Sequence, residues 1–212
     1  MKRHAAEAIG TFCLVFAGTG AIVIDDVSGG TISHLGISLV FGLVVMVMIY
    51  ALGHISGAHI NPAVTFGFWL SRRLPGKVVA TYILSQLTGA FAASSLVWLL
   101  FAHKTLGATH PAGSAGQAFI LETVLTAILM FVILCVVSGP KETGILAGIA
   151  IGGVIALEAL LAGPISGASM NPARSLAPAV LSGAIGDVWI YIAAPVLGAA
   201  IGVLGSRAIE SA

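Results

Sequence analysis

Charged side chains are the scarcest component of this sequence. Only 8% of its 212 residues are Asp, Glu, Lys or Arg, whereas about a quarter is usual for a soluble domain. Hydrophobic residues make up 58% of the chain, and the mean hydropathy is +1.08. A soluble fold cannot bury that much apolar surface, so the composition indicates a protein of the lipid bilayer. The net charge of +1 argues against a nucleic-acid partner.

Cysteine and catalytic motifs are also sparse. The two cysteines, Cys13 and Cys135, lie inside apolar runs and match neither a metal-ligand spacing nor a disulfide framework. The sequence contains no nucleophile with an adjacent base, no cluster of metal ligands and no phosphate-binding loop. We therefore expect a protein that is not an enzyme and that has no metal and no cofactor.

Long apolar runs, by contrast, fill most of the chain. A membrane helix needs about 20 largely apolar residues. Six segments are that long, at approximately 5–24, 34–53, 78–101, 117–137, 144–162 and 188–207. The first follows Lys2 and Arg3 as a secretion signal would, but Glu7 within it and a counterpart later in the chain favour a membrane span.

Two shorter apolar pieces, 61–70 and 171–181, have about half the length of a membrane span. Each begins with Asn-Pro-Ala. Asn is a favoured residue just before a helix, and Pro is favoured in its first turn. The sequence therefore predicts two half-helices that begin at Asn61 and Asn171.

An internal repeat is the strongest pattern. Residues 54–64 align with 164–174 at an offset of 110 positions, and seven of the eleven pairs are identical. Glu7 in the first apolar segment matches Glu122 in the fourth. We expect one channel domain, 1–212, made of repeat one (1–102) and repeat two (117–212). Three spans per copy invert the second copy, which predicts an all-α membrane protein with six transmembrane helices and two half-helices.

The basic residues predict an orientation. With a cytoplasmic N-terminus, seven of them face inward and two face outward, which follows the positive-inside rule. The seven are Lys2, Arg3, Arg72, Arg73, Lys77, Lys141 and Arg207, and the two are Lys104 and Arg174. We expect an integral protein of the plasma (inner) membrane with both termini in the cytoplasm.

The inverted half-helices should meet near the bilayer midplane. Non-helical backbone at that depth must line a wet cavity or be buried in protein. We expect carbonyl groups to line a pore at Gly57, Ala58, His59, Ile60, Gly167, Ser169 and Met170. The pore centre would hold Asn61, Pro62, Ala63, Asn171, Pro172 and Ala173. Both helix dipoles point their positive ends there, which repels cations and protons but not a neutral oxygen.

Charged and titratable residues inside the membrane are costly and need partners. We expect Glu7 and Glu122 to accept hydrogen bonds from the pore-loop backbone, with direct solute contact as the alternative. We expect His54 and His59 to line the cytoplasmic vestibule or to pack against the loop, with gating by protonation as a further alternative. For Glu158 the sequence leaves open whether it points to a helix contact or partly to the lumen, and whether it is ionised.

The two Asn-Pro-Ala boxes, each preceded by Ser-Gly-Ala and the second followed by Arg174, resemble the aquaporin (major intrinsic protein) family over nearly the whole chain. The resemblance implies six tilted helices and two half-helices around one pore in each subunit of a homotetramer. It also implies passage of water and small neutral solutes through a lipid bilayer.

The same resemblance implies a selectivity constriction formed by Phe41, Ala159, Ala168 and Arg174. Water-selective relatives usually have histidine at the second of these positions and a small polar residue at the third. Replacing an imidazole by a methyl group widens the neck, so solutes larger than water should be less hindered.

Other markers of the family are mixed. The stretch 162–176 looks most like the nodulin-26-like branch, whose members pass glycerol, urea and metalloid acids such as arsenite. Tyr191-Ile192 resembles glycerol channels, whereas Ser175 and Ala179 resemble water channels, and Phe41 departs from the tryptophan common in that branch. We expect a passive channel for water and small uncharged solutes. A strictly water-selective channel, a secondary transporter and a scaffold without flux are the alternatives.

Overall fold

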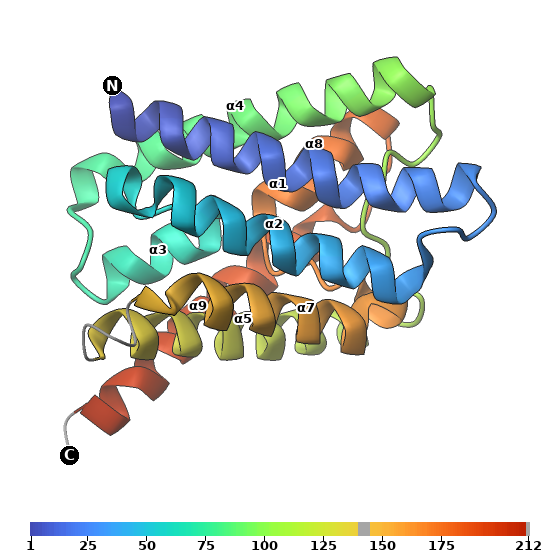
Figure 1. Cartoon of the computed structure of the whole chain (residues 1–212). Coiled ribbons are helices and arrows are strands. Elements are labelled where there is room, and N and C mark those ends of the chain that lie inside the picture. Colours follow the sequence, from blue (N-terminus) through green and yellow to red (C-terminus); the bar gives the residue numbers. More distant parts are fainter. Residues whose placement is uncertain (140–144, 211–212) are drawn as a thin grey trace.

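The computed structural model describes residues 1–139 and 145–210, and in these ranges the regular structure is all helical (Figure 1). The helices are α1 (Lys2–Val27), α2 (Ser33–Ser56), α3 (Pro62–Leu70), α4 (Gly76–Phe101), α5 (Ala115–Ser138), α7 (Ala147–Ser166), α8 (Pro172–Ser182) and α9 (Val188–Glu210). Six of them are long and apolar enough to cross a membrane, and α3 and α8 are about half that length. The predicted fold class is confirmed.

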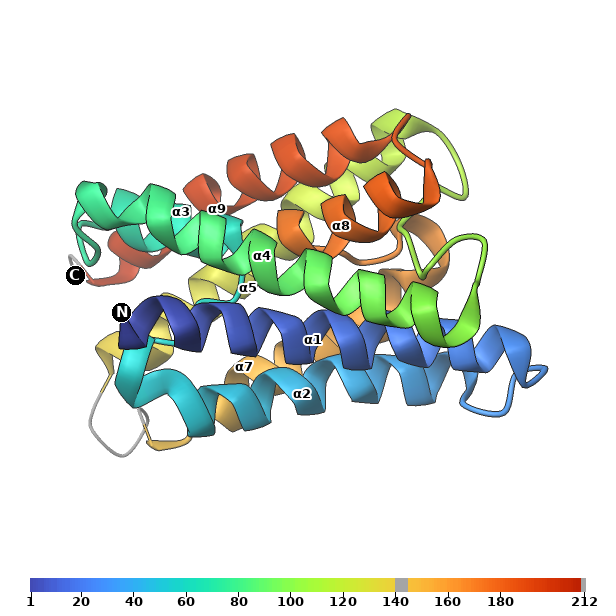
Figure 2. The ribbon, with the colours of Figure 1, turned by 90° about the horizontal axis from the view of Figure 1, so that it is seen from above.

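Each half of the chain has the same order of elements, two long helices, a half-helix and a long helix. Helix α1 packs against α4, α5 packs against α9, and α2 joins α7 across the two halves. The half-helices α3 and α8 lie toward opposite ends of the bundle, and the loops that precede them meet between them (Figure 2). We call the end that holds both chain termini the terminal end, and the other the far end.

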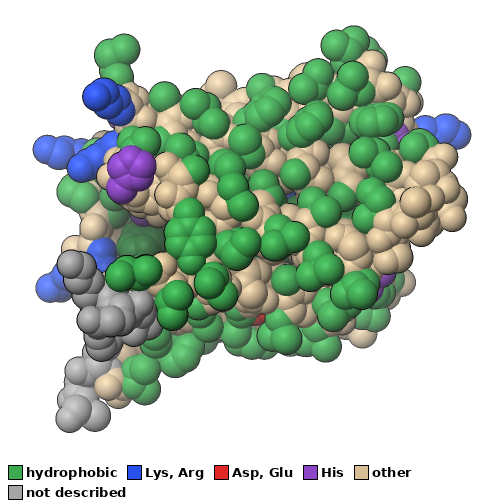
Figure 3. Space-filling model, in the orientation of Figure 1, with side chains coloured by type: hydrophobic (Ala, Val, Ile, Leu, Met, Phe, Trp, Pro, Cys, Tyr) green, Lys and Arg blue, Asp and Glu red, His purple; other side chains and the backbone are tan. Residues whose placement is uncertain are grey.

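The outside of the bundle is a broad apolar surface. Large side chains such as Leu99 and Leu161 are 74% and 71% exposed. Figure 3 shows hydrophobic side chains along the length of one face, while Lys and Arg gather mainly at the terminal end. This pattern fits a bilayer around the middle of the molecule and water at its ends. Lys141, which the sequence analysis assigned to the same side, lies outside the described residues.

Glycine allows the two halves to approach closely where α2 crosses α7. A Cβ atom built on Gly42 would lie 2.5 Å from the carbonyl oxygen of Gly152, and one built on Gly152 would lie 2.6 Å from that of Gly42. Small residues at such crossings let backbones touch in a membrane, where no hydrophobic force drives helices together. The contact fixes the distance between the helices on one side of the cavity described below.

Helices α2 and α7 both extend beyond the apolar segments predicted for them and end at Ser56 and Ser166. Glycine stops each helix, because Gly57 and Gly167 adopt left-handed φ angles of 96° and 85°. Pro164 lies within the last turn of α7 and cannot bond the carbonyl oxygen of Leu160. That oxygen lies 2.8 Å from Nε2 of His34, which supplies the missing partner.

Candidate functional site

Two loops in the middle of the bundle, 57–60 and 167–170, share the same unusual backbone. Ala58 and Ile60 have φ angles of 46° and 45°, and Ala168 and Met170, at the corresponding positions of the other loop, have 41° and 52°. Such angles are strained for residues with a side chain and persist only where the surroundings enforce them. The matched strain indicates that both loops are held in one required conformation.

Glu7 enforces the first loop from its place in α1. Its Oε1 atom accepts hydrogen bonds from the Ser56 hydroxyl at 2.7 Å and the His59 backbone N–H at 3.0 Å. Its Oε2 atom accepts from the Ile60 backbone N–H at 2.7 Å and from Nε2 of Gln86 at 2.7 Å. These donors satisfy a carboxylate that is fully buried.

Glu122 does the same for the second loop from its place in α5. It accepts from the Ser166 hydroxyl at 2.7 Å and from the backbone N–H groups of Ser169 and Met170 at 2.9 and 2.8 Å. Tyr191 adds a bond from its hydroxyl to the Ser166 carbonyl oxygen at 2.7 Å. In each loop, two backbone N–H groups are bonded to the carboxylate, and these bonds fix the loop backbone. Some carbonyl oxygens of the loops remain available to accept hydrogen bonds from a solute.

Asn61 and Asn171 cap the half-helices as predicted. Oδ1 of Asn61 accepts from the Ala63 N–H at 2.9 Å, and Oδ1 of Asn171 caps α8 in the same way. The Nδ2 groups cross between the loops, since Asn61 donates to the Met170 carbonyl oxygen at 2.8 Å and Asn171 donates to that of Ile60 at 3.0 Å. The sequence analysis did not foresee these cross-bonds, which tie the two half-helices together.

A cavity of about 800 Å³ extends from the terminal end past this central point, as far as Arg174. Its lining includes Asn61 and Asn171, and also the loop residues Gly57, Ala58, His59, Ile60, Ala168, Ser169 and Met170. Near the terminal end it is lined by Arg3, His54 and Arg73. The other box residues, Pro62, Ala63, Pro172 and Ala173, are buried in the first turns of α3 and α8 and are not among its lining residues.

His59 is held firmly in the cavity wall. Its ring stacks on Phe68 with centroids 4.4 Å apart, and its Nδ1 atom lies 3.1 Å from the Thr65 hydroxyl. His54 lines the same cavity but is exposed near the terminal end. The two histidines therefore occupy different environments, and His59 is the packed one.

A second cavity of about 450 Å³ lies toward the far end, and Gly167 is part of its wall. Phe41, Ala159 and Arg174 line both cavities, so the two cavities adjoin at these three side chains. Ala168 lines the larger cavity beside them. The four residues that the family resemblance assigned to a constriction therefore lie together.

Arg174 is the charged member of this group. It is 2% exposed, and its guanidinium carbon lies 5.1 Å from the centre of the Phe41 ring. Its Nη1 group donates to the Gly107 carbonyl oxygen at 2.8 Å. A cation in the first turn of a helix is unfavourable by the helix dipole, and the loop carbonyl and the aromatic face offset that cost.

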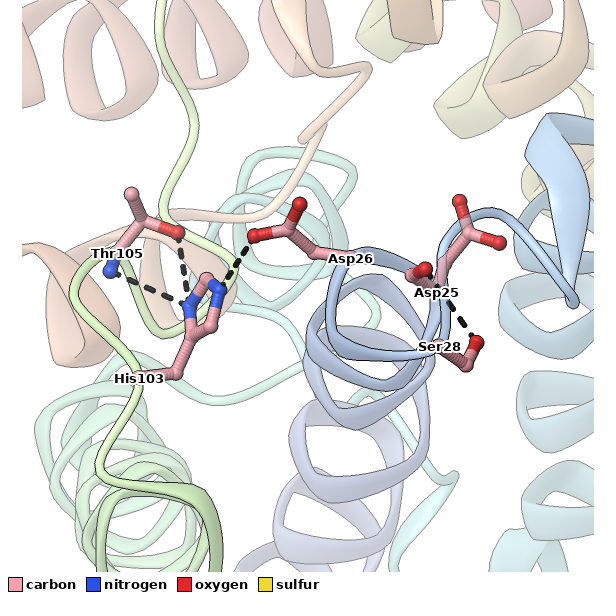
Figure 4. A network of polar contacts seen from close by, with 5 residues as sticks. All are labelled: Asp25, Asp26, Ser28, His103 and Thr105. Atoms are coloured by element: carbon pink, nitrogen blue, oxygen red, sulfur yellow. Dashed lines mark hydrogen bonds and ion pairs between the residues drawn. The ribbon is translucent and has the colours of Figure 1, made fainter.

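The loop that carries Gly107 is tied to the rest of the far end by His103 (Figure 4). Nε2 of His103 bonds Oδ2 of Asp26 at 2.7 Å. The Thr105 backbone N–H lies 3.3 Å from Nδ1, so Nδ1 accepts and Nε2 is the nitrogen that donates to the carboxylate. The loop is further anchored by the Thr109 hydroxyl, which donates to that of Ser175 at 2.8 Å.

Glu158 lies in α7 next to Ala159 but does not share its surroundings. It is 1% exposed and is absent from the lining of both cavities described here. Neither of its carboxylate oxygens has a hydrogen-bond partner among the described residues. The structure thus settles the direction that the sequence left open, because the side chain faces a helix contact and not the lumen.

Comparison with known proteins gives one consistent group of relatives. The family model described as Major intrinsic protein matches residues 1–205. The chain is 49% identical over 204 residues to Aquaporin NIP1-1 of Oryza sativa subsp. japonica, covering 95% of this chain and 72% of that protein. It is 49% identical over 199 residues to Probable aquaporin NIP4-2 of Arabidopsis thaliana, covering 93% and 70%. The X-ray structure of the aquaglyceroporin from Plasmodium falciparum superposes with a TM-score of 0.84 at 26% identity, covering 100% of this chain and 99% of that one.

Proposed function

The chain belongs to the major intrinsic protein family, and from this premise we propose that it is a passive transmembrane channel for water and small uncharged solutes that excludes protons and ions. The observation that carries the proposal is the meeting of the two half-helices, where both capping asparagines line one cavity. Like its family, it is a membrane channel protein and not an enzyme.

The pore centre is assigned to the two Asn-Pro-Ala boxes. Asn61 and Asn171 lie at the positive ends of two helix dipoles, which favours a neutral oxygen over a cation. The carbonyl groups of loops 57–60 and 167–170 supply acceptors along the path, except that those of Ile60 and Met170 already accept from Asn171 and Asn61. Water keeps hydrogen bonds on both sides of the centre, while an ion meets positive potential there.

The selectivity neck is assigned to Phe41, Ala159, Ala168 and Arg174. In this ring, Arg174 and Phe41 supply the charge and the aromatic wall, and the two alanines supply little bulk. Space is therefore available for solutes larger than water. We include glycerol and urea in the solute range, together with metalloid acids such as arsenite, in line with the aquaglyceroporin that shares the fold.

The proposal also places the protein in its membrane. The elements of the terminal end carry, in or beside them, Lys2, Arg3, Arg72, Arg73 and Lys77, and Lys104 lies in the loop that follows α4 at the far end. The positive-inside rule then puts both termini in the cytoplasm of a plasma-membrane protein. The apolar outer face accommodates lipid and three further copies in a homotetramer. One channel domain, 1–212, would contain repeats 1–102 and 117–212, of which 140–144 and 211–212 lie outside the described residues.

Stopped-flow light scattering on proteoliposomes tests the function directly. Vesicles that contain the protein should change volume faster than empty vesicles in response to sucrose, and they should also take up glycerol and urea. Water flow without glycerol or urea flow would establish the strictly water-selective alternative. An absence of any added flux would leave only a scaffolding role.

The neck can be tested by the substitution Ala159→His. The imidazole narrows the ring and adds a donor that water can use, so water flow should change little. Glycerol must fit a narrower opening, and a barrier higher by roughly 1.4 kcal/mol would slow it about tenfold. The measurement is the ratio of glycerol to water permeability on equal amounts of folded protein. An unchanged ratio would mean that the neck lies elsewhere.

A further inference from the structure

The far-end loop, residues 102–114, joins α4 to α5 across the far end of the bundle (Figure 1). Its Thr109 is only 5% exposed, although loops mostly lie on the surface. The Thr109 hydroxyl donates to the Ser175 hydroxyl at 2.8 Å. A Cβ atom built on Gly167 would lie 2.8 Å from the methyl carbon of Thr109, so this side chain also packs on the residue that begins loop 167–170. One loop residue thus contacts both α8 and the second pore loop.

The bond between Thr109 and Ser175 begins a chain of three buried hydroxyl groups. The Ser169 hydroxyl donates to the Asn171 carbonyl oxygen at 3.0 Å, and its oxygen lies 2.5 Å from that of the Ser175 hydroxyl. Each hydroxyl has one proton to donate. Because Ser169 uses its proton on Asn171, Ser175 donates to Ser169, and Ser175 itself accepts from Thr109. The donors therefore point in one direction, from the far-end loop to the capping asparagine of α8.

The first half of the molecule has a corresponding network with a different donor. At the offset of the two boxes, Thr65 matches Ser175. The Thr65 hydroxyl donates to the Asn61 carbonyl oxygen at 3.0 Å and accepts from Nε2 of Gln86 at 2.9 Å. The same amide nitrogen of Gln86 donates to Oε2 of Glu7 at 2.7 Å. In this half, the donor therefore comes from a membrane helix, α4.

The second half lacks this amide. The position that matches Gln86, at the offset that relates Tyr82 to Tyr191, is Pro195, which has no side-chain donor. Thr109 makes the bond to the half-helix hydroxyl that Gln86 makes in the first half. The two halves thus solve the same problem with donors from different kinds of element.

The far-end loop is bonded on both sides of Thr109. Before it, the Gly107 carbonyl oxygen accepts from Nη1 of Arg174 at 2.8 Å. After it, the backbone N–H of Ala112 donates to the Ile165 carbonyl oxygen in the last turn of α7 at 2.9 Å. These bonds place the Thr109 hydroxyl, because they hold the backbone on either side of it.

We propose that Thr109 is a positioning residue for the selectivity neck. Its hydroxyl supports loop 167–170 through the chain of hydroxyl groups, and Ala168 in this loop is one of the neck residues. The inference rests on the proposed channel function, which assigns the neck. Loop 57–60, in contrast, is held by side chains of α1 and α4. The far-end loop therefore supports the pore wall of the second half only.

Amide hydrogen exchange of the protein in proteoliposomes tests the support of the loop without any need for flux. Thr109→Val keeps the branched shape and the methyl group on Gly167 but removes the hydroxyl. We expect severalfold faster exchange in loop 167–170, because fewer bonds then oppose its local opening. Exchange in loop 57–60 should not change, which provides a control within the same molecule. Thr109→Ser keeps the hydroxyl and should exchange as the wild type does.

The matched control variant is Thr31→Val. Thr31 lies in the loop between α1 and α2, and its exposed hydroxyl donates to the Ser28 carbonyl oxygen. The substitution is the same in size and chemistry, but the lost bond does not reach either pore loop. We expect exchange in both pore loops to match the wild type.

The ratio of glycerol to water permeability tests the effect on the neck. The N–H groups of loop 167–170 are bonded to the buried Glu122, and the cavity lies on the other side of the loop. A loosened loop therefore moves into the cavity and narrows it. Narrowing hinders glycerol, which fills the neck, more than it hinders water. We expect Thr109→Val to lower the ratio severalfold, and Thr109→Ser and Thr31→Val to keep it.

A double substitution tests the path through Ser175. Ser175→Ala removes the middle hydroxyl and should give faster exchange in loop 167–170, as Thr109→Val does. If Thr109 acts through Ser175, the combined variant should exchange no faster than Ser175→Ala alone. Ser175→Ala also provides the exchange and permeability tests if Thr109→Val does not fold.

Four results would overturn the inference. The first is exchange at the wild-type rate in loop 167–170 of Thr109→Val, and the second is a Thr109→Ser variant that behaves like Thr109→Val. The third is additive effects of the Thr109 and Ser175 substitutions. The fourth is a permeability ratio that stays equal or rises while exchange becomes faster. A wild type without any added flux, but with the expected exchange rates, would contradict the channel function and leave the support of loop 167–170 by Thr109 established.

Discussion

Among single residues, Arg174 is the side chain to which the proposed channel assigns the exclusion of cations. Its place in the first turn of α8 puts a full positive charge beside the partial charge of the helix end. Only a firmly held guanidinium is tolerated there, and the Gly107 carbonyl oxygen and the Phe41 ring hold it. The charge is thus fixed beside the junction of the two cavities, which a cation would have to pass if the proposed channel is correct.

The substitution Arg174→Val should weaken this barrier. Removing the fixed charge lowers the energy of a proton or small cation at the neck, whereas water loses only one hydrogen-bond donor. We expect proton flux to rise above that of empty vesicles while water permeability persists. A pH-sensitive dye inside the vesicles measures the proton flux, and Lys104→Ala serves as a control for charge loss at the far end. Proton flux at background in a water-permeable variant would show that Arg174 is not the barrier.

For single residues, the sequence indicated well which side chains belong to the site, but it indicated little about the contacts that they make. The duplicated boxes located both capping asparagines, because Asn before Pro is a strong local signal for a helix start. The bonds from their Nδ2 groups to Met170 and Ile60 join residues more than 100 positions apart. No local rule relates such residues, so these bonds required the structure.

At the scale of helices and loops, the ends of the helices determine where these side chains lie. The apolar segments predicted six long helices correctly, but four of the helices end three or four residues later than predicted, among them α2 and α7. The hydropathy of the sequence falls at His54 and at Pro164, but the helical conformation continues up to the glycines that end α2 and α7. The last turn of α7 survives because His34 bonds the carbonyl oxygen that Pro164 leaves free. That compensation comes from another helix and leaves no trace in the local sequence.

The α2–α7 crossing should be sensitive to side-chain size. Gly152→Leu would push a side chain into the Gly42 carbonyl oxygen, and overpacking of this kind costs about 1–3 kcal/mol or more. We expect a lower unfolding temperature and loss of both water and glycerol flux. Gly153→Ala is the matched control, since a Cβ atom at Gly153 meets nothing within 4 Å. Equal thermal stability of the two variants would mean that the crossing is not as tight as the structure has it.

The far-end loop should depend on His103. His103→Ala removes the bond to Asp26, a partly exposed contact with a contribution of about 1 kcal/mol or less. Global stability should hardly change, while amide hydrogen exchange should become faster in the loop around Gly107. Asp26→Asn should give a smaller effect, because the asparagine side-chain oxygen can still accept from Nε2. Unchanged exchange in His103→Ala would show that the buried bonds of Thr109 and Arg174 hold the loop without this tie.

On the scale of the whole molecule, the repeat is what made the architecture predictable. Two copies with an odd number of spans must have opposite orientations in any membrane protein. What the repeat could not predict is where the copies diverge. Gln86 corresponds to Pro195, and Glu158 corresponds to the apolar Met48 at the offset of the two boxes. Such differences become meaningful only when the structure shows which partners they leave without a donor.

A fixed pore and a carrier built from inverted repeats differ in how flux depends on concentration and on ion gradients. Here the Asn61 and Asn171 cross-bonds, and the Gly42–Gly152 contact, join the two halves directly. A carrier needs its halves to rock against each other around the solute, and these ties oppose such motion. We therefore expect glycerol flux that rises linearly with concentration, is equal in both directions, and does not respond to sodium or proton gradients. Proteoliposomes with imposed gradients provide the measurement, and empty vesicles give the background. Saturation together with dependence on an ion gradient would require the cross-bonds to break in every cycle, and would favour a carrier over the pore.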